Sequence, residues 1–357
     1  MPTIRSTATA VPPHRIEQAQ VSAMARAYFG PSFPAIDRYM TVFEHAQIDA
    51  RYFAAPAEWF LTPHSFQEAN DLYISVASAL NQQVAQACLD QAGLTPADVD
   101  HVIFVSTTGM AAPSLDAVMI NRMGMGRHTR RTPIWGLGCA GGIGGLARAY
   151  DYALAHPSER VLLVATELCS VTFQWGDFSK RNFIASSLFA DGAAAVLVEG
   201  DAAKPVAQAA TAPLAILGTQ STTWPATHEV MGWDIVSTGM RVVFSARIPS
   251  IIQTLMRENV EELLSGHGLT LDDIEHWVLH PGGAKVVSAY ESSLGIDPER
   301  LRHTRSVLRD YGNMSSATVF FVLERFLRER AIKPGEYGVL AVLGPGFSCE
   351  LALVRGV

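Results

Sequence analysis

The sequence predicts an α/β fold made of two similar halves, each with parallel strands covered by helices on both faces. A repeated segment indicates the duplication, because Gly93–His101 resembles Gly268–His276 at an offset of 175 residues. Each copy precedes a short apolar run, Val102–Val105 in the first half and Trp277–Leu279 in the second. Short apolar runs between helices are typical of strands buried on both faces.

A second match supports the same conclusion. Gly138–Cys139 corresponds to Gly312–Asn313 at an offset of 174 residues. Each pair comes directly before a long helical pattern, which predicts helices over about Gly141–Ala155 and Ser315–Arg330. Two matches at nearly the same offset are unlikely to arise by chance, so we expect the halves to share one element order.

The other elements of each half follow in chain order. A helix is expected before each copy of the repeated segment, over about Ser75–Ala92 and Pro249–Ser265. Two further strands are expected to close each half: Arg160–Ala165 and Ala193–Val198 in the first, Tyr337–Leu343 and Cys349–Val354 in the second. The segment Gly200–Pro213 has the composition of a linker, so the predicted halves are residues 1–205 and 206–357.

Composition narrows the class of protein. With 357 residues, 48% hydrophobic and 17% charged, the chain is typical of a folded globular protein. Its net charge of −7 gives no electrostatic reason to expect a nucleic-acid partner. Two basic clusters, Arg127–Arg131 and Arg300–Arg305, are candidates for local anion sites.

The cysteines and the N-terminus predict a location. Four cysteines at scattered spacings match neither a metal site nor a disulfide framework, so we expect no metal and a reducing compartment. The first residues lack the apolar core of a signal peptide, and no stretch reaches the length of a membrane span. We therefore expect a cytoplasmic protein.

Cys139 is the candidate nucleophile. It lies among small residues in the segment Gly136–Gly142, which we expect to let a substrate approach the sulfur. The N-terminus of the following helix has unpaired N–H groups and a partial positive charge, both of which favour a thiolate. The alternative is a buried structural cysteine. That reading suits Cys88 and Cys169, whereas glycines on both sides argue against it for Cys139.

Two more candidates come from the second half. In a duplicated α/β fold, equivalent positions meet near the carboxyl ends of the strands, where such folds bind ligands. Asn313 is the counterpart of Cys139, and His280, at a predicted strand end, is the counterpart of Val105. A single histidine is more often structural, and an asparagine before a helix is often an N-cap.

Together the three side chains predict a specific chemistry. An imidazole near a thiol supports a thiolate–imidazolium pair, which is nucleophilic near neutral pH. The Asn313 carboxamide and the His280 N–H can donate to a carbonyl oxygen as it becomes negative. This set suits acyl transfer to Cys139, decarboxylation of a malonyl thioester to an enolate, and attack of the enolate on the acyl group.

The same segments resemble a known family. The surroundings of Cys139, His280–Gly283, Gly312–Ser316 and Gly344–Phe347 resemble the type III polyketide synthases, the chalcone synthase family, in order and spacing. The resemblance covers essentially the whole chain. Ketoacyl synthases of fatty-acid initiation usually have Gln-Ala-Asn where this chain has Pro-Gly-Gly after His280. Thiolases typically use a second cysteine as base, and this chain has no second cysteine at a position suited to that role.

The resemblance implies a thiolase fold, a duplicated αβαβα layered arrangement, in a homodimer with one active site in each subunit. It implies acyl-CoA and malonyl-CoA as substrates, with no tightly bound cofactor. Arg51 and Lys285 lie in regions that correspond to the coenzyme A-binding residues of the family.

The resemblance also assigns a substrate pocket. Its expected lining is Thr107, Thr108, Cys169, Thr172, Phe189, Trp233, Val242, Ser315 and the cyclisation loop Gly344, Pro345, Gly346 and Phe347. Phe189 matches one gatekeeper phenylalanine of the family. The chain departs from plant enzymes at Cys169 (a threonine there), Val242 (a second phenylalanine), Trp233 (a glycine) and Ala112 (a methionine that reaches across the dimer).

These departures predict a long acyl starter. Losing an aromatic gate and a methionine opens apolar space, in which each buried CH₂ contributes about 0.8 kcal/mol. Met231–Asp234 with Cys169 looks like bacterial and fungal enzymes that convert fatty acyl starters to alkylpyrones or alkylresorcinols. Four alternatives remain: Trp233 as a plain core residue, a short or aromatic starter, a single-condensation ketoacyl synthase, and a non-enzymatic acyl-binding protein.

Overall fold

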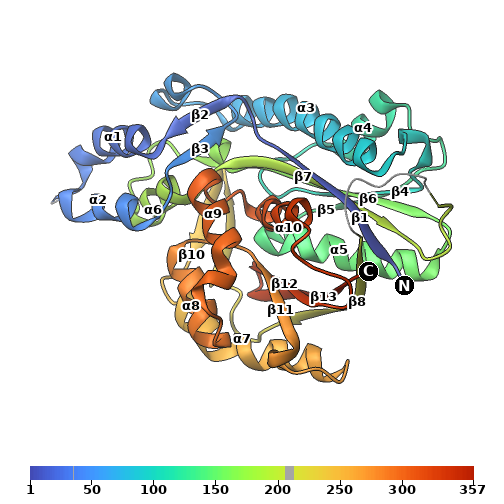
Figure 1. The fold of residues 1–357 in the computed structure, drawn as a ribbon. Helices are drawn as coiled ribbons and strands as arrows, with labels where there is room; N and C mark the ends of the chain where they lie inside the picture. Colours follow the sequence, from blue (N-terminus) through green and yellow to red (C-terminus); the bar gives the residue numbers. More distant parts are fainter. Residues whose placement is uncertain (35, 206–212) are drawn as a thin grey trace.

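The computed structural model describes residues 1–34, 36–205 and 213–357. Nine of the described strands form one sheet in the order β11-β12-β13-β8-β1-β7-β6-β4-β5 (Figure 1). The strands are β1 (Thr3–Ala10), β4 (His101–Val105), β5 (Arg130–Ile134), β6 (Arg160–Leu168), β7 (Asp191–Glu199), β8 (Leu214–Thr223), β11 (Ile274–Leu279), β12 (Tyr337–Gly344) and β13 (Ser348–Gly356).

The strand directions confirm the duplication. In the first half β4 runs parallel to β6, and β6, β7 and β1 follow as antiparallel neighbours. In the second half β11 runs parallel to β12, and β12, β13 and β8 follow in the same way. The halves meet at β1 and β8, which share only the pairs Thr3–Ala215 and Ile4–Leu214. The strands of the first half and those of the second half are therefore joined into one sheet through this short pairing of β1 with β8.

The repeated segment is duplicated in atomic detail. Gly93 and Gly268 each have φ near +70°, a conformation that glycine adopts without steric cost. Thr95 and Thr270 then open a short 3₁₀ turn, and each backbone N–H donates to the aspartate three residues later at 2.8 Å. The sequence match therefore reflects one turn used twice.

The helices form three layers around the strands, as Figure 1 shows. An outer layer contains α3 (Phe66–Ala92) and α4 (Leu115–Met123), a central layer α5 (Gly141–Ala155) and α10 (Thr318–Glu329), and the other outer layer α7 (Ile248–Ser265) and α8 (Ala284–Leu294). The central helices share one buried apolar cluster with strands of both halves. The predicted αβαβα arrangement is confirmed.

The helix boundaries differ from the predictions at one main point. Helix α5 has the predicted bounds, and α7 begins one residue before the predicted start. Helix α3, in contrast, begins at Phe66 rather than near Ser75, because Ser65 and Glu68 form a capping box.

A smaller group of elements lies at one end of the layers. It contains the helices α1 (Gln18–Phe29), α2 (Ile36–His45), α6 (Lys180–Leu188) and α9 (Arg302–Tyr311), the strand pair β2 (His14–Glu17) and β3 (Ala50–Phe53), and the hairpin of β9 (Met231–Val236) and β10 (Gly239–Phe244). Helices α1, α2 and α6 project beside the layers and share an aromatic cluster that includes Phe29 and Phe183 (Figure 1).

The predicted boundary between the halves lies at 205/206, where the first half of the described chain stops. Much of the predicted linker Gly200–Pro213 therefore falls outside the described residues. Within the described ranges no helix combines the length and the apolar composition needed to cross a membrane.

Candidate active site

Cys139 lies in a short turn directly before α5, where the two halves touch. Gly138 has φ of +49°, and a Cβ added there would lie 2.7 Å from Pro345. A Cβ on Gly142 would lie 2.4 Å from the carbonyl oxygen of Ser316. We expected these glycines to give a substrate access to the sulfur. The structure gives them another role, because they allow the second half to pack directly against the turn and the helix.

The sulfur of Cys139 is buried and faces Ser315. Its Sγ lies 3.5 Å from the Oγ of Ser315, and the residue is 8% exposed. Burial raises the pKa of Cys139 to about 12, because an apolar environment disfavours the thiolate. The helix N-terminus does not reverse this effect, so the expectation of a thiolate in the free protein is wrong for this arrangement.

His280 follows β11, and its ring has no polar partner within the described residues. It is 3% exposed, and among the described residues neither ring nitrogen has a hydrogen-bond partner. Burial lowers the pKa of His280 to about 4, so the ring is neutral at physiological pH. Buried polar groups are nearly always hydrogen-bonded, so two unpartnered nitrogens indicate a position for a ligand. The predicted thiolate–imidazolium pair is not formed in this arrangement.

Asn313 is fixed on all sides. Its Oδ1 accepts from the Ser315 backbone N–H at 2.9 Å, and its Nδ2 donates to Gly282 O at 3.1 Å. Its backbone pairs with the first half, through N–H to Leu188 O and through O to the Ala190 N–H. The N-cap of the following 3₁₀ turn is Met314, so Asn313 is not the cap, although its side chain accepts from the first N–H of that turn. One N–H of the carboxamide remains for another acceptor.

A continuous set of contacts joins the three candidate residues. The sulfur of Cys139 contacts Ser315, whose backbone N–H donates to Asn313. Asn313 donates in turn to Gly282, whose own N–H donates to His280 O at 3.0 Å. Ser315 has φ of +48°, an uncommon value for a residue with a side chain. The structure thus brings all three candidates to the boundary between the halves.

Glu167 is a buried polar residue that the sequence analysis did not single out. It is fully buried at the end of β6 and accepts from the Thr107 N–H (2.9 Å), the Thr108 hydroxyl (2.9 Å) and the Ser316 hydroxyl (2.6 Å). Burial raises the pKa of Glu167 to about 7. A glutamate directly after the apolar run Val161–Ala165 and Thr166 was the available signal, because charged residues are almost never buried without partners.

Thr107 and Thr108 have internal roles. The Thr107 hydroxyl accepts from the Gly138 N–H at 3.1 Å, which fixes the turn before Cys139. The Thr108 hydroxyl accepts from the Leu168 N–H at 2.8 Å while it donates to Glu167. Both residues are 1% exposed. Their hydroxyls therefore support the Cys139 turn and the end of β6, rather than pointing freely into a pocket.

A large apolar cavity lies beside the site. Its volume is about 500 Å³, and α1, α6 and the β9–β10 hairpin contribute to its wall. Five predicted pocket residues line it: Cys169, Thr172, Phe189, Trp233 and Val242. Trp233 and Val242 are opposite each other in the hairpin, and the Phe189 and Trp233 rings are 6.4 Å apart. A cavity of this size is typical of small-molecule sites.

The cavity approaches Cys139 through two residues. The backbone of Phe189 forms an isolated bridge with Asn313, which ties this wall to the candidate site. Cys169 is close enough to Cys139 for their charges to interact, and burial raises its pKa well above the usual value. Cys139 does not itself line the cavity.

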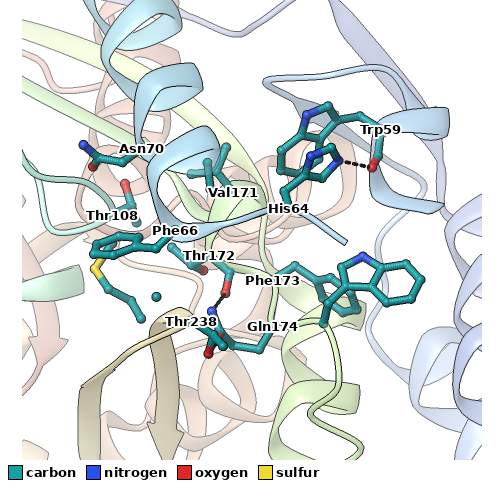
Figure 2. A pocket seen from close by; sticks show the side chains of 14 residues that line it. Trp59, His64, Phe66, Asn70, Thr108, Val171, Thr172, Phe173, Gln174 and Thr238 are labelled. Atoms are coloured by element: carbon teal, nitrogen blue, oxygen red, sulfur yellow. Dashed lines mark hydrogen bonds between the residues drawn. The ribbon is translucent and has the colours of Figure 1, made fainter. Parts of the chain in front are cut away.

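A second, smaller hollow is lined by the residues drawn in Figure 2, and Phe173 is part of its wall. Thr172, Phe173 and Trp175 line both spaces, and Thr108 lines only the hollow. The Gln174 amide donates to Thr172 O, and Gln174 Oε1 accepts from Thr238 (Figure 2). The hollow has a volume of about 20 Å³, which suits one water molecule. Of these two spaces, the larger cavity is the one with room for an acyl group.

The loop Gly344–Phe347 packs against the Cys139 turn. A Cβ on Gly344 would lie 2.5 Å from both the Ala140 Cβ and the Leu137 carbonyl oxygen. Phe347 is fully buried, and its ring stacks on Trp224 with centroids 5.7 Å apart. The loop therefore lies at the site, and its predicted part in cyclisation stays a prediction.

The two predicted coenzyme A contacts have different positions. Arg51 is 1% exposed, and its three nitrogens donate to Gln18 Oε1, Phe189 O and Ser186 O. Its guanidinium is thus engaged inside the protein, and the expectation that it meets a phosphate at the entrance is wrong. Lys285 is exposed in the first turn of α8, five residues after His280, and its role stays a prediction.

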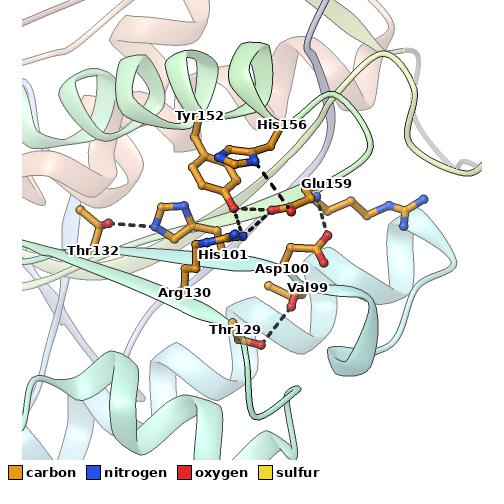
Figure 3. Close-up of polar contacts among 10 residues, drawn as sticks. Val99, Asp100, His101, Thr129, Arg130, Thr132, Tyr152, His156 and Glu159 are labelled. Atoms are coloured by element: carbon orange, nitrogen blue, oxygen red, sulfur yellow. Dashed lines mark hydrogen bonds and ion pairs between the residues drawn. The ribbon is translucent and has the colours of Figure 1, made fainter.

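The two basic clusters are paired with acids. Arg130 donates to Glu159 at 2.8 Å beside Tyr152 and His156, at the amino ends of the strands (Figure 3). Arg131 makes two hydrogen bonds to Asp116. In the second cluster Arg302 pairs with Glu329 and Arg305 with Glu291. These ion pairs argue against free anion sites.

The described part of the chain contains no cluster of metal-binding side chains. Across residues 1–34, 36–205 and 213–357, no group of three or more His, Cys, Asp or Glu side chains is arranged to hold a metal ion.

Known proteins share this sequence and this arrangement. Residues 56–202 match the family described as chalcone and stilbene synthases, N-terminal domain, and residues 216–357 match its C-terminal domain. The chain is 41% identical over 356 residues to a Bacillus subtilis (strain 168) protein whose name assigns it provisionally to the chalcone synthases, covering 98% of this chain and 97% of that one. It is 39% identical over 350 residues to a 1,3,6,8-tetrahydroxynaphthalene synthase of Streptomyces peucetius subsp. caesius, covering 97% and 91%.

A solved structure agrees. The crystal structure of 1,3,6,8-tetrahydroxynaphthalene synthase from Streptomyces coelicolor A3(2), a bacterial type III polyketide synthase, matches with a TM-score of 0.93. The two sequences are 31% identical, and the match covers 99% of each chain.

Proposed function

Because the chain belongs to the chalcone and stilbene synthase family, the type III polyketide synthases, we propose that it extends fatty acyl starters with malonyl units. It has the thiolase fold of that family and is a malonyl-CoA condensing acyltransferase. Its substrates are acyl-CoA and malonyl-CoA. The proposed product is an alkylpyrone or an alkylresorcinol.

In the loading step Cys139 attacks the acyl-CoA thioester. His280 takes the thiol proton, the sulfur forms a bond to the carbonyl carbon, and the bond from that carbon to coenzyme A breaks. The proton leaves on the coenzyme A thiol. Two observations support His280 as the base: its ring is neutral, and both of its nitrogens are free of hydrogen-bond partners within the described chain.

In the extension step malonyl-CoA loses CO₂. The bond to its carboxylate breaks and the electron pair forms an enolate, whose oxygen accepts hydrogen bonds from His280 and Asn313. The enolate carbon attacks the acyl carbonyl on Cys139, a carbon–carbon bond forms, and the bond from the acyl carbon to sulfur breaks. The sulfur leaves as a thiolate and takes a proton from water. The unused N–H of the Asn313 carboxamide supports this role.

The cavity supports the starter class. About 500 Å³ of space is lined largely by aliphatic and aromatic side chains and reaches the site at Cys169 and Phe189. An alkyl tail bound there leaves water at a gain of about 0.8 kcal/mol for each CH₂. Val242 is small where a phenylalanine would narrow the same space.

A second candidate has a short or aromatic starter. Relatives at 39% and 36% identity are named for 1,3,6,8-tetrahydroxynaphthalene and 3,5-dihydroxyphenylacetyl-CoA, and neither name contains an alkyl chain. The size of the cavity favours the fatty acyl starter over this candidate.

Mass spectrometry of products separates the two candidates. The purified protein is incubated with malonyl-CoA alone and with hexanoyl-, lauroyl- or coumaroyl-CoA. We expect lauroyl-CoA to give the highest turnover and pyrone or resorcinol masses. Preference for coumaroyl-CoA, or a product from malonyl-CoA alone at a higher rate, would favour the second candidate.

Substitution of Val242 tests the cavity directly. Val242→Phe fills the wall beside Trp233, so we expect the preference to move to shorter starters by more than about tenfold over a few carbons. Val243→Phe is the matched control, because successive strand residues face opposite sides and Val243 does not line the cavity. An unchanged length profile in Val242→Phe would contradict the fatty acyl proposal.

The assembly and location follow from the family resemblance. We propose a homodimer in the cytoplasm. Strand β5 lies at the edge of the nine-stranded sheet, and Trp135, directly after it, is 50% exposed, which supports this edge as the dimer contact.

A further inference from the structure

Arg51 is a cation buried between the two halves. It is 1% exposed, and its side chain runs from β3 to the end of α6. Its Nη1 donates to Phe189 O at 2.7 Å, its Nη2 to Ser186 O at 2.8 Å and its Nε to Gln18 Oε1 at 3.0 Å. A planar guanidinium can make three such bonds in fixed directions, which a lysine cannot.

These bonds complete the carboxyl end of α6. A helix leaves its last carbonyls without partners inside the helix, and a cation there is favourable. Arg51 takes the carbonyls of Ser186 and Phe189, Gln18 donates to Ser187 O at 2.9 Å, and the Asn313 N–H takes Leu188 O at 3.0 Å. Every carbonyl at this end is thereby satisfied.

The same side chain supports the turn that carries Asn313. Gly312 has φ of +74°, and a Cβ there would lie 2.9 Å from the Arg51 Cγ and Cδ. The Asn313 backbone is paired on both sides with the chain that leaves α6, through Leu188 and Ala190. A displacement of Arg51 therefore moves α6 and the Asn313 turn together.

The buried charge has a counter-charge. Asp191 follows α6, is fully buried and favours the charged form of Arg51, whose pKa burial lowers to about 9. Asp191 also accepts from the Ala54 N–H at 2.7 Å, just after β3. The carboxyl group thus fixes the chain that follows β3 on one side and Ser170 on the other.

We propose that Arg51 is a positioning residue of the condensing reaction, which sets the places of the Asn313 carboxamide and of Phe189 through the end of α6. This role rests on the proposed function of Asn313. This positioning role replaces the contact with a coenzyme A phosphate that the family resemblance implied for Arg51.

The first experiment separates decarboxylation from loading. For Arg51→Met we expect malonyl-CoA decarboxylation, measured as CO₂ release, to fall by about 10- to 100-fold, since loss of a whole oxyanion donor costs about 10²–10³. Arg51 also lines the large cavity, so acyl transfer to Cys139, measured by intact-protein mass spectrometry, is not expected to stay unchanged. It should fall much less than decarboxylation, because Arg51 makes no hydrogen bond to Cys139 or His280 and methionine keeps an apolar chain in its place. Arg51→Lys, which keeps the charge without the fork, should be intermediate.

A double variant tests whether Arg51 acts through Asn313. Arg51→Met combined with Asn313→Ala should decarboxylate no more slowly than Asn313→Ala alone, because residues that act as a unit are not additive. Multiplied effects would show a general loss of structure and overturn the proposal. Wild-type decarboxylation by folded Arg51→Met would overturn it as well.

Arg160→Met is the matched control. Arg160 is also buried, at 7% exposure, but it lies at the start of β6, the end of that strand far from the site. It donates to Glu199 at the end of β7. Its substitution should lower the melting temperature without changing the ratio of decarboxylation to loading. If Arg51→Met does not fold, Gln18→Met removes one partner of Arg51 and should give the same change of ratio to a smaller extent.

These experiments distinguish failure of the positioning role of Arg51 from failure of the proposed function. If wild type and Asn313→Ala decarboxylate malonyl-CoA equally well, the role of Asn313 fails first. If Asn313→Ala is slow and Arg51→Met is not, only the positioning role fails.

Discussion

Burial keeps Cys139 as a neutral thiol and His280 as a neutral imidazole. Neither charge is favourable alone in this site. Transfer of the thiol proton to the ring creates both charges at once, and their attraction at low dielectric offsets part of the cost. We therefore place the ion pair in the reacting complex and not in the resting arrangement.

Substitution of Cys139 separates the two half-reactions. Cys139→Ala should abolish acyl loading and product formation, because no other thiol contacts Ser315. Cys139→Gln should still release CO₂ from malonyl-CoA, since His280 and Asn313 remain. Product formation by Cys139→Ala at the wild-type rate would contradict the assigned nucleophile.

The pH dependence of acyl loading tests the base. If His280 accepts the proton in the reacting complex, the rate of acyl transfer from lauroyl-CoA to Cys139 should reach half its maximum at lower pH in wild type than in His280→Ala. We expect a difference of at least about one pH unit, which is 1.4 kcal/mol of interaction. Identical profiles would exclude His280 as the proton acceptor.

Glu167 should make stability depend on pH. Burial raises its pKa from 4.5 to about 7, so the folded state binds a proton that the unfolded state has lost between those values. Its contribution to stability is present below about pH 4.5 and is lost as pH rises towards 7. Glu167→Gln has no such loss. In urea unfolding, the free energy of wild type relative to this variant should fall by about 2 kcal/mol from pH 5 to 7.5.

A constant difference between the two proteins would show that the carboxyl group titrates normally. Asp191, whose pKa burial also raises to about 7, is present in both proteins and cancels from the comparison.

At the level of elements, the glycines of α5 control how closely the halves pack. A Cβ on Gly142 would meet the Ser316 carbonyl at 2.4 Å, whereas on Gly144 it would meet only the end of the Leu137 side chain, at 3.0 Å. Helix interiors favour alanine over glycine by about 0.5–1 kcal/mol. The two positions therefore separate helix propensity from packing.

Gly142→Ala should destabilise the protein by about 1–3 kcal/mol, because overpacking displaces backbone. Gly144→Ala, in the same helix, should be near neutral or slightly stabilising. The free energy of unfolding of the two variants gives the answer. Equal values would mean that the contact between the halves adjusts freely.

The elements that could be predicted were those with local signals. The repeated turn at Gly93 and Gly268, and the glycine-flanked start of α5, depend on backbone conformations that few residues adopt. The start of α3 was misplaced because the capping box at Ser65 lies outside the apolar pattern. The β9–β10 hairpin was not predicted as strands, although two of its residues were selected for the pocket.

The errors at single residues have one cause. The family resemblance placed Arg51 at the coenzyme A entrance and the Thr107 and Thr108 hydroxyls in a pocket, whereas all three residues are 1% exposed and their polar groups are bonded inside the protein. Burial depends on contacts between distant segments, which a single sequence does not contain. Cys139 was found from its small neighbours and the helix that follows it, and the duplication then pointed to Asn313 as its counterpart and to His280 as the counterpart of Val105.

At the level of the whole molecule, the exposed edge of the sheet predicts the assembly. Sedimentation should give twice the chain mass of 38.6 kDa. Trp135→Lys, beside β5, should shift the protein towards monomer because a charge enters the proposed contact. Leu154→Lys is the matched control, since Leu154 is equally exposed, at 51%, on the surface of α5. A monomeric wild type would contradict the homodimer.

The central place of β1 has a consequence for how the chain is made. Residues 3–10 leave the ribosome before the other strands of the sheet, yet they pair with β7, where Ala10 meets Ala193, and with β8. At about 5–20 residues per second, the first strand waits roughly ten to forty seconds for its neighbours. During that time a strand destined for the centre of the sheet has unpaired backbone N–H and C=O groups, so the growing chain exposes a strand edge with which other chains can pair.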